Sequence, residues 1–396
     1  MPSGRFPSAE GIDSVIDCFN GKLGHRSTSR VDFKEVAVAG KEARAGSRPT
    51  IADVAEAAGV ARSTVSRAMN REHTFYRSDS AARIRAVAES LGYEPNPSAA
   101  NLRRRQTNTI GVLVSRLTDT VMATLYEEIA AACAARGYHA LVATTYGDPG
   151  LERENGHAML ASRVDGLILT TATTEGGLCA ELLERGIPHV LALRAYGASP
   201  SVTGDDPLGG YLATRHLIDL GHREIGIVAG PDEAPTALGR REGYRRALAE
   251  GGLQERPEFV YPSTFSMESG EAAAEAFLAG SRRPTAVFAV NDNTAIGFTS
   301  VIQRAGLRIP QDLSVVGYND IPLVARLAVP LTSVRVPFRE IAAAAVDELL
   351  TSINGQPASP QRQRVLAPTV IPRASTGRPP GEARDTAPPR PQTAAR

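Results

Sequence analysis

From Thr109 to about Pro372 the sequence alternates short apolar runs with longer amphipathic stretches. "TIGVLV" precedes "TLYEEIAAACAARG", "EIGIVAG" precedes "GRREGYRRALAEGG", and "TAVFAV" precedes "NTAIGFTSVIQRAG". The first member of each pair favours a β-strand. The second has the length of a helix and ends in glycine, which is common just after a helix. Repeated strand–helix units predict parallel sheets with helices on both faces.

About ten such strands are more than one sheet comfortably holds. We therefore predict two similar α/β lobes, which is consistent with a chain of 396 residues. In parallel α/β folds, ligands bind at the carboxyl ends of the strands. With two lobes, the expected ligand site lies in the cleft between them.

A different pattern occupies residues 50–70, "TIADVAEAAGVARSTVSRAMN". Its first half has apolar residues at helical spacing, namely Ile51, Val54, Ala55 and Ala58. Gly59 ends that helix, because a left-handed backbone is cheap only for glycine. A second helix is predicted from Arg62 to Met69, and the tight turn between them makes a helix-turn-helix.

A third helix, "SAARIRAVAESLG", would complete a small core, with Ile84, Val87 and Leu91 facing inward. The second helix exposes Arg62, Ser63 and Arg67, of which arginine is suited to guanine in the major groove. Further candidate DNA contacts, mostly to phosphate, are Thr50, Thr64, Ser66 and Asn70. The alternative is an ordinary helical hairpin without DNA function.

Charge supports the DNA-binding interpretation. The chain has a net charge of only +1, yet residues 48–106 contain ten arginines, no lysine and six acidic residues. A basic module ahead of a slightly acidic body is typical of a protein that binds nucleic acid through one domain.

Together with "LGYEPN", residues 50–70 resemble the headpiece of the lac repressor (LacI/GalR) family of bacterial transcription regulators. The resemblance continues through "TNTIGVLV", "VDGLIL", "LGHREIGIVAGP", "REGYRRAL", "NDNTAIG", "DLSVVGYND" and "PLTSVRVP", and it covers roughly residues 49–376. It implies a helix-turn-helix headpiece, a hinge helix and a two-lobed core like that of periplasmic binding proteins. It also implies a repressor that binds a near-palindromic operator as a homodimer; a tetramer is not excluded.

The resemblance assigns "PNPSAANLRRR" to the hinge helix, where Leu102 is the residue that wedges into the minor groove. Arg103 and the two arginines after it would face the flanking phosphates. The alternative for these arginines is a solvated linker. The sequence departs from the family at Ala61, where a capping serine is usual, and this weakens the helix N-terminus by about 1 kcal/mol.

The resemblance also places effector contacts between the lobes, at Arg194, Arg240, Asn291 and Asn319. Arginine and asparagine suit a polyhydroxylated ligand such as a sugar. "DTVM" stands where the family usually has "NPFF", which leaves Val121 and Met122 as candidate lining residues.

Two family acids are missing near this site, because Asn319 and Leu193 replace the usual aspartates. Two arginines are kept, so a sugar phosphate or another acidic ligand is an alternative to a neutral sugar. Asn291 has a structural alternative as a helix cap, and Arg240 as a solvated residue. We expect Asp205 and Asp206 to cap a helix, and His216 and His222 to pack rather than catalyse.

These interpretations define the predicted domains: a poorly ordered extension (1–47), the headpiece (48–94), the hinge (95–107), the two-lobed domain (108–376) and a disordered tail (377–396). The alternative for residues 1–47 is a translation start assigned too far upstream. Lobe 1 is predicted at 108–203 and 337–364, and lobe 2 at 204–333 and 365–376.

Other classes of protein are disfavoured. The sequence has no GxGxxG, P-loop, GxSxG or HExxH motif and no Cys/His cluster, so we expect no enzyme, cofactor or metal. Its three cysteines have no paired spacing, and no apolar run has the length of a membrane span. A cytoplasmic protein is expected. The rival interpretation is a solute-binding protein of the same two-lobed fold without DNA function.

Overall fold

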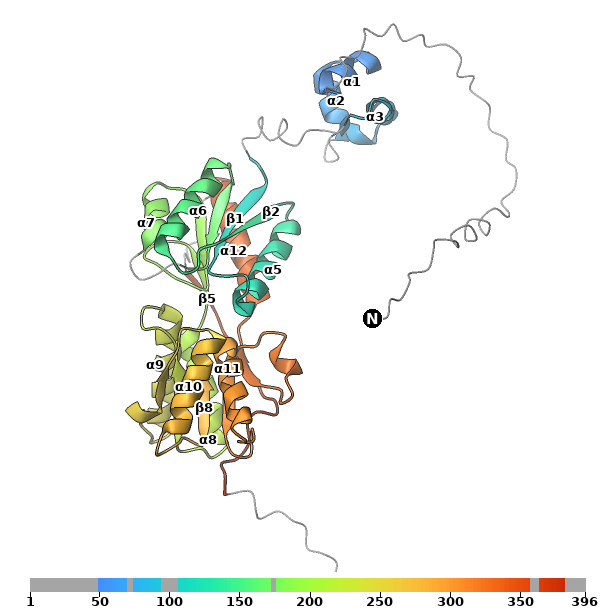
Figure 1. Ribbon diagram of the computed structural model, residues 1–396. Helices are drawn as coiled ribbons and strands as arrows, with labels where there is room; N and C mark the ends of the chain where they lie inside the picture. The colour runs from blue at the N-terminus through green and yellow to red at the C-terminus, as the bar shows by residue number, and fades with distance from the viewer. Residues whose placement is uncertain (1–48, 70–73, 94–105, 172–175, 357–362, 382–396) are drawn as a thin grey trace, which may run out of the picture. The chain divides into compact units, whose positions relative to one another are not determined.

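The computed structural model describes residues 49–69, 74–93, 106–171, 176–356 and 363–381 (Figure 1). These residues form two compact units, a small helical headpiece of residues 49–93 and a larger α/β unit that begins at residue 106. The predicted extension and hinge helix, with Asn70, Leu102 and Arg103, lie outside the described residues.

The headpiece consists of α1 (Ile51–Ala58), α2 (Arg62–Met69), a 3-10 turn η1 (Thr74–Arg77) and α3 (Asp79–Ser90). Its core contains Val54, Val65 and Ile84, each at most 2% exposed. The helix-turn-helix prediction is confirmed. The prediction for Leu91 was wrong: α3 ends at Ser90, and Leu91 follows it with 38% of its surface exposed, while Ala88 fills the core instead.

Lobe 1 of the larger unit is built on a sheet with the strand order β11-β5-β4-β3-β1-β2. Its strands are β1 (Thr109–Val114), β2 (His139–Thr144), β3 (Gly166–Leu169), β4 (His189–Ala192), β5 (Ser201–Gly204) and β11 (Gln363–Leu366). All of its strand pairs are parallel. Helices α5 (Thr120–Ala134) and α12 (Phe338–Ile353) pack together, as do α6 (Pro149–Ala161) and α7 (Gly177–Glu184).

Lobe 2 repeats this plan with the strand order β12-β10-β9-β8-β6-β7. Its strands are β6 (Ile225–Ala229), β7 (Val260–Pro262), β8 (Ala286–Ala289), β9 (Ser314–Asn319), β10 (Thr332–Arg335) and β12 (Thr369–Ile371). Only the pairing of β10 with β12 is antiparallel among the described strands. Helices α8 (Asp206–Asp219) and α9 (Pro235–Glu250) pack together, as do α10 (Met267–Ala279) and α11 (Asp292–Arg304). The two-lobed parallel α/β prediction is confirmed.

The chain passes between the lobes at three places: between β5 and α8, between β10 and α12, and between β11 and β12. Two predicted limits therefore shift. Gly204 and Leu366 pair with each other at the edge of the lobe 1 sheet, whereas the sequence pattern assigns residue 204 and residues 365–366 to lobe 2.

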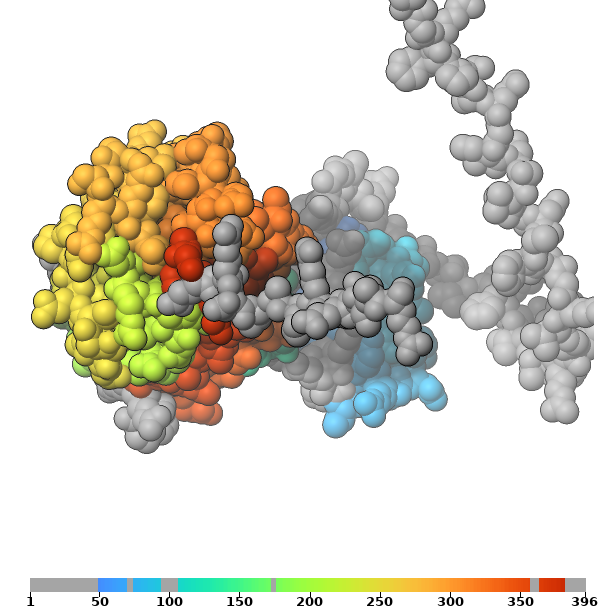
Figure 2. All heavy atoms as spheres, turned by 90° about the horizontal axis from the view of Figure 1, so that it is seen from below, coloured from blue at the N-terminus to red at the C-terminus, as the bar shows by residue number. Residues whose placement is uncertain are grey.

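Lobe 2 also extends beyond residue 376. Gly377 accepts hydrogen bonds through its carbonyl from Ser314 and lies 3.0 Å from His222 Nε2, and its N–H donates back to Ser314. His216 hydrogen-bonds with Thr376 at 3.0 Å. Figure 2 shows this red terminal segment beside the green surface of α8. Gly377 is therefore held against lobe 2, one residue beyond the predicted limit, and both histidines pack against this terminal segment.

No helix in the described parts of the chain is long and apolar enough to cross a membrane. Within the same residues, no group of three or more His, Cys, Asp or Glu side chains is placed to hold a metal ion.

Candidate DNA-binding surface and effector site

The turn between α1 and α2 sets the direction of the second helix. Gly59 has φ +65°, the left-handed conformation in which an L side chain is strained. The Gly59 N–H donates to the Glu56 carbonyl at 3.2 Å and the Val60 N–H to the Ala55 carbonyl at 3.0 Å. This pair of bonds closes the end of α1.

Helix α2 presents an exposed polar face. Val65 and Ala68 are fully buried, whereas Arg62, Ser63 and Arg67 are exposed. Arg67 makes one long hydrogen bond, from Nε to the Ser63 carbonyl at 3.3 Å. Neither Arg62 nor Arg67 forms a salt bridge with another described residue. Their charges are thus available to an external anion or base edge.

The other predicted DNA contacts differ in their surroundings. Thr64 and Ser66 are half-buried. Thr50 is exposed and caps α1: its backbone N–H and its hydroxyl donate to Asp53 Oδ2 at 2.7 and 2.8 Å. These bonds, the backbone one first, lower the pKa of Asp53. The hydroxyl oxygen of Thr50 keeps its acceptor capacity.

Arg85 holds the headpiece together, a role that the sequence did not reveal. From α3, its Nη1 donates to the Ala68 carbonyl at 3.1 Å and to the Tyr76 carbonyl at 2.8 Å, and its guanidinium lies 4.0 Å from the centre of the Tyr76 ring. It therefore joins the end of α2 to η1 and α3. Arg83, two residues earlier on the same helix, is exposed instead.

In the larger unit, Arg240 of α9 is 6% exposed and fully engaged. Its Nε donates to Asp206 at 2.8 Å, its Nη1 to the Val290 carbonyl at 2.6 Å, and its guanidinium lies 3.8 Å from the centre of the Tyr318 ring. Burial alone would lower the pKa of Arg240, but the Asp206 carboxylate more than compensates and raises it.

These contacts place Arg240 at the ends of β8 and β9, because its partners Val290 and Tyr318 directly precede Asn291 and Asn319 in the chain. Three of the four residues that the resemblance assigned to effector contacts therefore converge on the carboxyl ends of the lobe 2 strands. Arg240 is not solvated. Asp206, expected as a helix cap, is instead its ion-pair partner, while Asp205 caps α8 by accepting from the Leu208 N–H at 2.9 Å.

Arg194 follows β4 in lobe 1 and reaches lobe 2. It is half-buried, and its Nη1 donates to the Thr236 hydroxyl at 2.6 Å. Burial, and then the like charge of Arg240, lower the pKa of Arg194 to about 10. Thr236 lies on α9, one turn before Arg240, so the arginines approach from opposite lobes.

Asn291 and Asn319 are both buried, at 3% exposure each. Asn291 caps α11, because its Oδ1 accepts from the Thr294 N–H at 2.8 Å and its Nδ2 donates to the Phe265 carbonyl at 2.9 Å. The structural alternative for Asn291 is thus realised. Asn319 ends β9 with φ +108°, a conformation that asparagine adopts more readily than most residues.

Val121 and Met122 face the interior of lobe 1. Val121 is 5% exposed within the main hydrophobic core, and Met122 packs against that core with its sulfur 3.5 Å from the Thr170 hydroxyl. Val121 therefore packs in the core of the lobe, because the first turn of α5 directs it against the sheet, and a contact of either residue with an effector stays a prediction.

The residues just before Val121 connect the lobes instead. Asn293 of α11 donates from Nδ2 to Asp119 Oδ1 at 2.8 Å, and its Oδ1 accepts from the Thr120 hydroxyl at 2.5 Å. Asn293 is 5% exposed. The sequence holds one indication of this bridge. "NDN" contains two asparagines, and since Asn291 caps α11, Asn293 is left for another contact.

Between the two asparagines, Asp292 is fully buried. Its oxygens accept from the Ser333 hydroxyl at 2.7 Å and the Ile321 N–H at 2.9 Å. Burial raises the pKa of Asp292 to about 7, despite these bonds. Asp292 therefore anchors the start of α11 to β10 and to the loop after β9.

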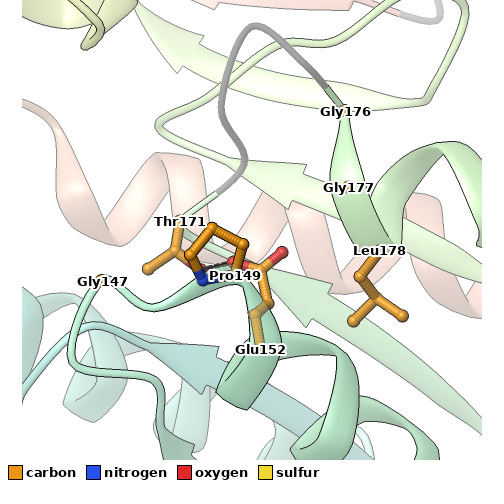
Figure 3. Close-up of a pocket in the computed structure, with 7 residues that line it drawn as sticks. All are labelled: Gly147, Pro149, Glu152, Thr171, Gly176, Gly177 and Leu178. Carbon is orange, nitrogen blue, oxygen red and sulfur yellow. Dashed lines mark hydrogen bonds between the residues drawn. The ribbon is translucent and has the colours of Figure 1, made fainter.

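A small cavity lies where β2 and β3 end in lobe 1 (Figure 3). Its lining includes Glu152, which accepts from the Thr171 hydroxyl at 2.6 Å, and Gly176 at the start of α7. Its volume of about 20 Å³ is enough for roughly one water molecule. None of the predicted effector contacts lines this cavity, nor the open hollow beside His157 and Arg185.

Comparison with known proteins links both units to one family. Residues 50–96 match the model of bacterial regulatory proteins of the lacI family, and residues 214–376 match a periplasmic binding protein-like domain. The ribose operon repressor of Haemophilus influenzae is 35% identical over 82% of this chain and 98% of its own length. The HTH-type transcriptional repressor PurR of Photobacterium profundum is 32% identical over 77% of this chain and 92% of its own.

Solved structures agree. The lac repressor dimer bound to operator and the anti-inducer ONPF has a TM-score of 0.74 at 28% identity, over 84% of this chain and 100% of that one. A complex of the transcriptional regulator CelR with cellobiose has a TM-score of 0.63 at 31% identity, over 83% and 100%. With the exposed basic face of α2 and the two lobes that follow the headpiece in the chain, these findings show that the chain belongs to the lacI family of bacterial regulatory proteins and is a DNA-binding transcriptional regulator.

Proposed function

We propose that this protein is a cytoplasmic repressor that binds a near-palindromic operator as a homodimer. The observation that carries the proposal is the face of α2, where Arg62, Ser63 and Arg67 are exposed and neither arginine forms a salt bridge with a described residue. Arginine forks can pair with guanine edges, and a twofold dimer presents two such helices to an inverted repeat.

A small molecule bound between the lobes controls this binding. Support comes from the two bridges between the lobes, Asn293 to Asp119 and Thr120, and Arg194 to Thr236. A ligand that changes these contacts changes the relative stability of the lobe arrangements. A difference of about 1 to 3 kcal/mol is typical of such coupling between sites. The sugar named in the CelR complex supports a sugar or sugar derivative as the effector.

The test is selection of genomic DNA fragments by the purified full-length protein. We expect enrichment of a near-palindrome of about 14 to 20 base pairs, and affinity that falls steeply with salt. Arg67→Ala should cost roughly 1 to 3 kcal/mol and relax the preference at one base position.

Arg83→Ala is the matched control, because Arg83 is also an exposed arginine of the headpiece but lies on α3. It should leave base preference unchanged. Weak binding of all fragments alike would contradict the proposal and favour a solute-binding function. Loss of the same size on every sequence after Arg67→Ala would show that Arg67 contacts phosphate.

A further inference from the structure

We propose that the effector is a small organic anion, and that Arg194 binds its phosphate or carboxylate group. The inference rests on the proposed function, in which a small molecule binds between the lobes. It goes further because it predicts that the molecule is negatively charged and that Arg194 binds its charged group.

The first argument is the unused hydrogen-bonding capacity of Arg194. A guanidinium carries five N–H donors. In the described parts of the chain, the side chain of Arg194 makes one hydrogen bond, to the Thr236 hydroxyl. No carboxylate there comes within salt-bridge distance of it, unlike Arg240 with Asp206. The side chain is nevertheless half-buried, where an unpaired charge is costly.

The second argument is the balance of charge. Asp206 Oδ1 accepts from Arg240 Nε at 2.8 Å and from the Tyr318 hydroxyl at 3.1 Å, so this carboxylate is committed to Arg240. One carboxylate therefore lies near two guanidinium groups, and it pairs with Arg240 while offsetting the charge of Arg194 only in part. Repulsion from Arg240 adds to burial in lowering the pKa of Arg194. A bound anion would relieve both effects.

The third argument separates an anion from a neutral sugar. A sugar can offer Arg194 only hydroxyl oxygens, and the Thr236 hydroxyl already provides that contact. A phosphate or carboxylate adds an opposite charge, and its planar or forked oxygens can accept two parallel N–H bonds from the guanidinium. Asn319, buried at the end of β9, is uncharged and would not repel such a ligand.

Inorganic phosphate is the first probe. Melting temperatures of the full-length protein are measured in phosphate and in chloride of equal ionic strength, for the wild type, Arg194→Gln and the control Arg185→Gln. Arg185 is an exposed lobe 1 arginine paired with Glu181, so the control removes the same charge from the same lobe. Phosphate also stabilises proteins in general, and the comparison between variants isolates the site.

We expect phosphate to raise the melting temperature of the wild type and Arg185→Gln equally, and by clearly less in Arg194→Gln. An equal rise in all three proteins would overturn the proposal, as would the absence of any rise of the wild type over chloride with both phosphate and acetate. Acetate in place of phosphate tests a carboxylate, and an effect through Arg194 with either anion supports the inference.

Glucose and glucose 6-phosphate form the second, matched pair of probes. If the phosphate ester binds through this site, Arg194→Gln should weaken it about tenfold or more. Binding of glucose with equal affinity to glucose 6-phosphate would overturn the proposal. If Arg194→Gln does not fold, Arg194→Lys replaces it, because lysine keeps the positive charge but lacks the two parallel N–H donors. The comparisons of phosphate with chloride and of glucose 6-phosphate with glucose on the wild type also remain as tests. DNA binding measured without ligand tests the proposed function separately.

Discussion

Arg240 and Asp206 form an ion pair with Nε and Oδ1 2.8 Å apart, and the two side chains are only 8% and 14% exposed. The pair joins α9 to the start of α8, and Tyr318 completes it from β9. Each charge therefore neutralises the other. Arg240, which the sequence predicts as an effector contact, is already bound to another residue of the protein.

We predict that Arg240→Gln destabilises the protein by about 3 to 5 kcal/mol, because Asp206 is left as an uncompensated buried charge. Denaturant unfolding followed by circular dichroism measures the change. Arg304→Gln, which breaks an exposed pair with Glu271, should cost only about 0 to 1 kcal/mol. Adding Asp206→Asn to Arg240→Gln should recover part of the loss; an additive double variant would contradict the pairing.

The bridge at Asn293 gives a second prediction. Asn293→Ala removes the bonds to Asp119 and Thr120 and should cost roughly 1 to 3 kcal/mol. Asn293→Asp should cost more, since it places a carboxylate against Asp119. Hydrogen exchange should rise at the starts of α5 and α11. An equal loss of unfolding free energy in both variants would contradict the prediction that a carboxylate at position 293 is repelled by Asp119.

In the headpiece, α2 has no side-chain cap: the Ala61 carbonyl accepts from the N–H groups of Thr64 and Val65, but its methyl group accepts nothing. Ala61→Ser should stabilise α2 by about 1 kcal/mol, because the serine hydroxyl can accept a hydrogen bond from a backbone N–H group in the first turn of the helix. Slower amide exchange in α2 would confirm the gain. Ala61→Val, which adds no acceptor, should give no protection.

Asp292 predicts how stability depends on pH. Its pKa in the folded protein is about 7, above the ordinary value of 3.8. The folded state therefore holds this proton more tightly than the unfolded chain, and the resulting stabilisation is complete below pH 3.8 and is lost as the pH rises to about 7. Asp292→Asn keeps an acceptor for the Ile321 N–H and removes the titration. From pH 4 to 8, the melting temperature of the wild type should therefore fall relative to that of Asp292→Asn. Parallel curves for the two proteins would contradict the raised pKa.

The sequence predicted the elements well, because their periodicity and their glycine ends are local. It also located Arg240, Asn291 and Asn319, which converge at the ends of β8 and β9. It did not predict what each side chain does there. Asn291 is taken up by a helix cap and Arg240 by Asp206, 34 positions earlier in the chain.

The same limit applies to Val121 and Asn293. "DTVM" indicated a surface near the site, but which of its residues faces the core depends on how α5 packs on the sheet. The bond between Asn293 and Asp119 joins residues 174 positions apart, and no local pattern encodes such a pairing. Residues that act through distant partners are thus the ones that sequence reasoning misses.

The edge strands β11 and β12 have a consequence for synthesis. β11 pairs with β5, and β12 with β10, so each sheet gains its last strand only when residues 363–371 have left the ribosome. The helices of residues 51–90 emerge first, and domains generally fold as they emerge. A nascent or truncated chain that stops before β11 would therefore carry a complete headpiece, while the sheets of both lobes would each lack an edge strand.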